Sequence, residues 1–162
     1  MVLSSGKESD FYVDCKQTSL SAAGHLLIGR LLHGLVRAEF PEARAIGGPT
    51  IGADPLVSAT ATVSAERGDP LDAFLIRKEP KGHGTGAPIE GLGNLGPRCP
   101  VVVVEDVITT GASTLRSISR CLECELKVLG VVALVDRLEG GRQAIEAEGH
   151  RVLALYTRKD FP

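Results

Sequence analysis

The sequence predicts an α/β fold in which a mostly parallel sheet is flanked by helices. Apolar runs of strand length alternate along the chain with segments of helical periodicity, as in parallel sheets covered by helices. The four valines of Val101–Val104 are typical of a strand buried on both faces. The chain has 162 residues, of which 43% are hydrophobic and 23% charged, so it can form one globular domain with a core.

The first half of the chain is expected to give two helices and two strands. In order, these are helix 19–40, strand 43–48, helix 53–68 and strand 71–79. The first helix follows from apolar residues at helical spacing, with Leu27, Leu31 and Leu35 on one face. The second begins with Asp54 and Pro55, which suit a first helical turn.

The second half continues the alternation after a long connection. Residues 80–100 are rich in Gly and Pro and lack periodicity, so we expect a long loop there. The following elements are strand 101–106, a helix from 113, strand 128–137, helix 140–149 and strand 150–157. Ligands bind at the carboxyl ends of strands in such sheets, and polar residues gather there in this chain.

The strand of valines runs directly into EDVITTGAS, residues 105–113. Backbone N–H groups of this loop, together with the positive end of the following helix dipole, form an anion site. Thr109, Thr110 and Ser113 add hydroxyl donors, and Gly111 permits a tight turn. The loop therefore predicts a site for one phosphate.

Two acids, Glu105 and Asp106, precede the hydroxyl residues. They suit sugar hydroxyls or a hydrated Mg²⁺ better than a phosphate, so the ligand is expected to be a ribose that carries a phosphate. Ordinary helix capping would explain one Ser or Thr but not two adjacent acids. The segment lacks the GK[ST] ending of a P-loop and the GxGxxG of a dinucleotide fold.

The stretch VVVVEDVITTGAS resembles the phosphoribosyl-pyrophosphate (PRPP) binding motif of type I phosphoribosyltransferases. Three further segments, LSSGKESDFYVDCK, RKEPKGHGTGAPIEG and VDR, resemble orotate phosphoribosyltransferases in the right order through essentially the whole chain. The resemblance implies a type I phosphoribosyltransferase fold over residues 1–162 as a single domain, with a short N-terminal hood segment and a long flexible catalytic loop.

The implied reaction joins orotate to PRPP and gives orotidine 5'-monophosphate and pyrophosphate, in pyrimidine (UMP) biosynthesis. Bond breaking at the anomeric carbon puts negative charge on the departing pyrophosphate, so a metal and cations help and no protein nucleophile is needed. The expected cofactor is Mg²⁺, held mainly by PRPP, with no protein metal ligands.

The resemblance also implies the site residues. The catalytic residues are Lys81, Glu105 and Asp106. The PRPP contacts are Arg77, Lys78, Lys81, His83, Glu105, Asp106, Val107, Ile108, Thr109, Thr110, Gly111, Ala112 and Ser113, and the orotate contacts are Thr109, Arg137 and Tyr12. The cations of RKEPKGHG open a Gly-rich loop that suits a mobile cover excluding water; a solvated charge run is the alternative.

Several interpretations stay open. GGPTIGADP, residues 47–55, is either a second anion loop for pyrophosphate or a set of plain turns, and Tyr12 either flanks the base or lies in the core. Asp136 either orients Arg137 or caps the end of its strand. Many family members have a lysine where this chain has Ser4, with Lys7 as a possible substitute, and some have one where this chain has Gly52.

Composition limits the partners. The net charge of -2 argues against general nucleic-acid binding. The first ten residues lack the apolar run of a signal peptide, and no apolar stretch is long enough for a membrane span, so the expected location is the cytoplasm, with the four cysteines as free thiols. The resemblance implies a homodimer in which the lid loop, the Gly-rich loop opened by RKEPKGHG, closes over the active site of the neighbouring subunit. Two alternatives remain: a transferase for another base, and a PRPP-binding regulator.

Overall fold

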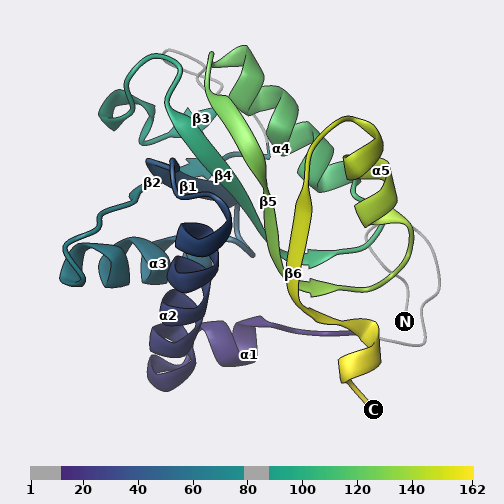
Figure 1. The fold of residues 1–162 in the computed structure, drawn as a ribbon. Helices are drawn as coiled ribbons and strands as arrows, with labels where there is room; N and C mark the ends of the chain where they lie inside the picture. Colours follow the sequence, from purple (N-terminus) through teal and green to yellow (C-terminus); the bar gives the residue numbers. More distant parts are fainter. Residues whose placement is uncertain (1–11, 79–87) are drawn as a thin grey trace.

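Six strands form one sheet in the order β3-β2-β1-β4-β5-β6 (Figure 1). The structure is a computed structural model that describes residues 12–78 and 88–162. The strands are β1 Ala45–Pro49, β2 Asp72–Ile76, β3 Ile89–Glu90, β4 Pro100–Ile108, β5 Lys127–Asp136 and β6 Val152–Thr157. Every neighbouring pair is parallel except β2–β3. The predicted mostly parallel α/β sheet is therefore confirmed.

Helices lie on both faces of this sheet (Figure 1). They are α1 Lys16–Ser19, α2 Ala22–Glu39, α3 Asp54–Glu66, α4 Ala112–Glu123 and α5 Gly141–Ala147, with 3₁₀ turns at Leu92–Asn94 and Arg158–Asp160. Within the described residues, no helix is both long and apolar enough to cross a membrane.

The valines of β4 divide between two cores, as strand alternation requires. Val102 and Val104 pack in a cluster with buried residues of α2 and α3. Val101 and Val103 pack in the opposite cluster, with residues of α4 and α5. All four valines are fully buried. The prediction of a strand buried on both faces is therefore confirmed.

The buried face of α2 differs from the face marked by the leucines. Leu27 and Leu31 are 57% and 47% exposed, whereas Leu32 and Val36 are fully buried. Apolar residues occur on more than one side of this helix, so periodicity alone could not select the face that meets the sheet. The predicted helix 19–40 is also divided, because the side chain of Ser21 accepts the N–H of Gly24 and caps a new helix.

The expected loop over 80–100 was partly wrong. From Pro88 onward the chain forms β3, which pairs antiparallel with β2 through Leu75–Glu90 and Ile76–Ile89, and then a 3₁₀ turn. A strand of two residues is too short to produce a readable alternation, so only the tertiary pairing reveals it.

Two glycines on α2 predict opposite effects on stability. A Cβ at Gly29 would lie 2.5 Å from the carbonyl oxygen of Ala59 on α3, whereas a Cβ at Gly34 would meet nothing within 4 Å. We expect Gly29→Ala to lower the free energy of unfolding by about 1–3 kcal/mol through overpacking. Gly34→Ala should raise it by about 0.5–1 kcal/mol, because alanine favours a helix. Urea unfolding of both variants measures this, and equal effects of the two would contradict the packing.

Candidate active site

The strand β4 is longer than the sequence indicated. It continues through Glu105 to Ile108, because Val107 and Ile108 pair with Val135 and Asp136 of β5. The predicted strand 101–106 is therefore confirmed, but it begins one residue earlier and ends two residues later than expected. The turn between strand and helix comprises residues 109–111 only, and α4 begins at Ala112.

Two glycine backbones meet at this turn. Gly111 has a φ of 81°, and a Cβ on it would lie 2.8 Å from the carbonyl oxygen of Gly141. The N–H of Gly141 donates to the carbonyl of Thr109 at 2.9 Å. The start of α5 therefore supports the turn from one side, and a side chain at position 111 would force the two loops apart.

The N-terminus of α4 opens at the surface. Ala112, Ser113 and Thr114 belong to the first turn, where helical N–H groups lack helical acceptors. Thr110, Ala112 and Ser113 are exposed, and Ile108 is buried. Exposed donors and a positive helix end thus occur together, as an anion site requires.

Glu105 lies beneath α4 rather than at the surface. The residue is 5% exposed, and one carboxyl oxygen accepts a hydrogen bond of 2.9 Å from the hydroxyl of Thr114. Burial and the neighbouring charge of Asp106 raise the pKa of Glu105 to about 8. The carboxyl is then largely protonated at neutral pH and joins β4 to the first turn of α4. The sequence interpretation missed Thr114. The one indication of its role in the sequence was that it is a hydroxyl residue near the start of the helix.

Asp106 points to the other face of the sheet, toward the loop after β1. Its carboxylate accepts the N–H of Val107 at 2.8 Å. A Cβ at Gly52 would lie only 2.4 Å from this carboxylate. The contact accounts for the glycine at position 52, since a lysine there would have to displace Asp106 or the loop. The loop 47–55 and the acid pair therefore meet at one place.

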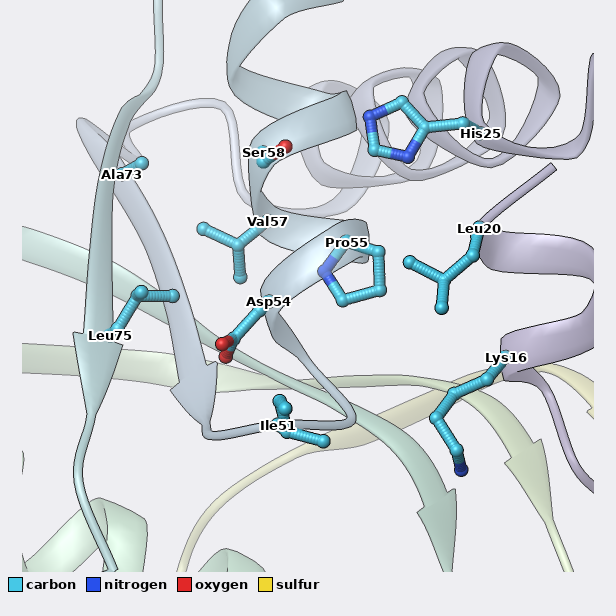
Figure 2. Close-up of a pocket in the computed structure, with 10 residues that line it drawn as sticks. All are labelled: Lys16, Leu20, His25, Ile51, Asp54, Pro55, Val57, Ser58, Ala73 and Leu75. Atoms are coloured by element: carbon cyan, nitrogen blue, oxygen red, sulfur yellow. The ribbon is translucent and has the colours of Figure 1, made fainter. Parts of the chain in front are cut away.

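A pocket of 440 Å³ lies beside that loop, between α1, α3 and β2 (Figure 2). Its lining is mainly apolar and includes Leu20, Ile51 and Leu75. Asp54 also lines it (Figure 2), with one carboxyl oxygen buried and without a hydrogen-bond partner in the described part of the chain. Burial raises the pKa of Asp54.

The carboxyl end of β5 brings Arg137 next to the turn after β4. The N–H of Arg137 donates to the carbonyl of Ile108 at 3.0 Å, so Arg137 begins its loop beside Thr109. Its side chain is buried and pairs with Glu139 at 2.6 Å. Asp136 accepts the N–H of Leu138 at 2.8 Å and so caps the turn after the strand, which is one of the two roles expected for it.

The remaining predicted residues lie at the edges of this site or outside the described residues. Arg77 follows β2 and pairs with Glu90 at 3.0 Å, and the exposed Lys78 comes next. Tyr12 is 55% exposed, so it is not a core residue. Lys81 and His83 fall among residues 79–87, and Ser4 and Lys7 among residues 1–11, outside the described residues. In the described ranges no group of three or more His, Cys, Asp or Glu could hold a metal ion.

Comparisons with known proteins identify the family. No protein-family model matches the chain. The chain is 48% identical over 161 residues to the orotate phosphoribosyltransferase of Sorangium cellulosum, covering 99% of this chain and 83% of that protein. It is 49% identical over 154 residues to the Aquifex aeolicus orotate phosphoribosyltransferase, covering 95% and 82%. The chain belongs to the orotate phosphoribosyltransferase family.

A solved member of this family has the same fold. The Mycobacterium tuberculosis orotate phosphoribosyltransferase, crystallised with PRPP, superposes with a TM-score of 0.81 at 36% identity, covering 93% of this chain and 83% of that one. The predicted type I phosphoribosyltransferase fold is therefore confirmed, and the family resemblance found in the motifs is confirmed with it.

The raised pKa of Glu105 predicts a pH dependence of stability. In the folded state Glu105 holds a proton that it loses near pH 4.5 in the unfolded state. Its contribution to the free energy of unfolding therefore falls as pH rises from about 4.5 to about 8. Within that window its slope approaches about 1.4 kcal/mol per pH unit. Glu105→Gln should remove this slope, and the exposed Glu148→Gln should keep it. Urea unfolding at several pH values measures both, and a slope unchanged in Glu105→Gln would contradict the burial of a neutral carboxyl.

Proposed function

We propose that this chain transfers the phosphoribosyl group of PRPP to orotate, giving orotidine 5'-monophosphate and pyrophosphate in pyrimidine biosynthesis. The observation that carries the proposal is the β4–α4 turn, where an open helix N-terminus adjoins two acids and a buried arginine. Membership of the orotate phosphoribosyltransferase family supports it.

In this proposal the 5'-phosphate binds at the start of α4. The N–H groups of residues 110–113 and the hydroxyls of Thr110 and Ser113 donate to its oxygens, and Thr109 lies between phosphate and base. Asp106, which is half-buried on the site side of β4, accepts from a ribose hydroxyl. Glu105 acts from below, because its carboxyl fixes Thr114 and therefore the first turn of α4.

Orotate carries a carboxylate, which requires a cation in the site. Arg137 supplies it from the end of β5, and its pair with Glu139 orients the guanidinium. The exposed ring of Tyr12 is free to flank the base. A cation at this position suits an anionic base better than a neutral purine.

The cations after β2 act on the leaving group. Arg77, Lys78, Lys81 and His83 bind the pyrophosphate, and Lys81 neutralises the charge that builds on it as the bond to the ribose breaks. Mg²⁺ supplies further charge neutralisation when it is bound with PRPP. The site suits this mode of binding, since Mg²⁺ prefers substrate phosphates and waters to a set of protein ligands, and Asp106 is the hard oxygen donor nearest the ribose.

We also infer a cytoplasmic homodimer. Leu20 and Ile51 are each 69% exposed at the rim of the apolar pocket in Figure 2. Exposed apolar patches of this kind mark interaction surfaces. The partner is a second copy of the chain, because the lid loop is expected to close over the active site of a neighbouring subunit. Analytical ultracentrifugation tests the dimer, and a monomer at assay concentration would contradict it.

Activity is measured by mixing the purified chain with orotate, PRPP and Mg²⁺ and following the loss of orotate absorbance. We expect turnover, and we expect Lys81→Ala to lower kcat by about 10²-fold or more, since removal of one charge-stabilising donor typically costs that much. The exposed Lys159→Ala is the matched control and should retain activity.

Two outcomes of this assay would contradict the proposal. Turnover of adenine in place of orotate would identify a transferase for another base. No turnover with any base, with PRPP still bound in calorimetry, would indicate a PRPP-binding regulator.

A further inference from the structure

A short loop, residues 137–140, joins β5 to α5 (Figure 1). At its start the N–H of Arg137 donates to the last carbonyl of β4, and just beyond its end the N–H of Gly141 donates to the carbonyl of Thr109. Both ends of the loop are therefore held against β4 and the turn after it. The path of the chain between these ends decides where the side chain of Glu139 lies.

Leu138 lies in a backbone conformation that leucine rarely adopts. Its φ of 59° is in the left-handed region, where a Cβ crowds the backbone. Core packing does not impose this conformation, because Leu138 is 45% exposed. The buried Asp136 holds it instead, since its carboxylate accepts the N–H of Leu138 at 2.8 Å. Unfavourable backbone conformations of this kind cluster at functional sites, and this one lies in the turn that brings Glu139 back to Arg137.

The side chains of Arg137 and Glu139 form a close ion pair. Nη2 of Arg137 lies 2.6 Å from Oε1 of Glu139, and the two side chains are 4% and 35% exposed. Burial removes water from the guanidinium, so the carboxylate compensates a charge that would otherwise be costly there. A guanidinium binds carboxylates best through a planar fork of N–H groups. A carboxylate fixed at one nitrogen limits the rotation of this fork and so sets the plane that a second carboxylate meets.

Glu139 can keep this contact when a ligand binds. A guanidinium has five N–H donors, and the pair with Glu139 is made through Nη2, so two carboxylates can share the group. Displacement of Glu139 would instead break a short charge-assisted hydrogen bond to a buried cation. The geometry therefore favours Glu139 as a support for Arg137 over Glu139 as a competitor of the ligand.

We propose that Glu139 is a positioning residue that makes the site selective for a base that carries a carboxylate. Glu139 acts through Arg137, which is proposed above to bind the orotate carboxylate, so this inference rests on the proposed function. A base without a carboxylate has no group for the oriented fork, and Glu139 therefore contributes little to its binding. The turn at Leu138 is the device that keeps Glu139 in place.

The test compares two nucleotides that differ in this carboxylate alone. Orotidine 5'-monophosphate has it, and uridine 5'-monophosphate is the same nucleotide without it. Calorimetric titration of the full chain gives the Kd of each, in the parent and in Glu139→Gln. We expect the variant to bind orotidine 5'-monophosphate about tenfold more weakly, because a charge-assisted hydrogen bond that orients Arg137 is lost. Its Kd for uridine 5'-monophosphate should change by less than about twofold.

Two further variants separate positioning from general damage. Glu146→Gln removes the acid of another Arg–Glu pair, with Arg142 at 3.0 Å on α5, and should bind both nucleotides as the parent does. Leu138→Gly keeps both side chains of the Arg137–Glu139 pair but frees the turn, since glycine has many more backbone conformations available. This variant should also lose affinity for orotidine 5'-monophosphate in preference to uridine 5'-monophosphate. Circular dichroism checks that each variant is folded, and Leu138→Gly carries the test if Glu139→Gln is not.

Three results would overturn the proposal. Tighter binding of orotidine 5'-monophosphate by Glu139→Gln would show that Glu139 competes with the base. Equal loss of both nucleotides would show a general structural role. A parent that binds the two nucleotides equally, or binds neither, would show that the site does not select a carboxylate. Absence of orotate turnover, with the two nucleotides still distinguished, would contradict the proposed function alone.

Discussion

The close contact between Gly111 and Gly141 is the constraint on which the site depends. It holds the turn after β4 against the start of α5, and the bond from Gly141 to the carbonyl of Thr109 fixes the same contact. The first turn of α4 is thereby presented at the carboxyl edge of the sheet, where the loop after β5 also begins. The donors proposed for phosphate and Arg137 consequently lie next to each other, although they are far apart in the sequence.

The two adjacent acids, Glu105 and Asp106, lie on opposite faces of β4 and make different contacts. Strand alternation sends Glu105 under α4, where burial keeps its carboxyl neutral and Thr114 holds it. Asp106 faces the loop after β1 and meets Gly52. Glu105 therefore holds the first turn of α4, where the phosphate is proposed to bind, and Asp106 lies against the loop 47–55. A buried acid without Thr114 would lack its described hydrogen-bond partner.

Much of this arrangement could be predicted from the sequence, because local patterns determine it. The valines of β4 identify a strand buried on both faces, and the hydroxyls and glycine after it indicate the anion site. Other features depend on contacts between distant residues. β3 is too short to show an alternating pattern, and the exposed leucines of α2 have the same helical spacing as its buried residues. The hydrogen bond between Glu105 and Thr114 exists only because α4 folds back over β4. Arg77, Arg116 and Arg120 likewise line one cavity only because α4 packs beside the end of β2.

The central claim is that a phosphate binds at the β4–α4 turn. The most direct measurement is a titration of ¹⁵N-labelled protein with ribose 5-phosphate, observed through backbone amide chemical shifts. The account predicts that, among the described residues, the largest shifts fall on Thr110, Gly111, Ala112, Ser113 and Thr114. Shifts concentrated around the pocket of Figure 2, with these amides unmoved, would contradict it.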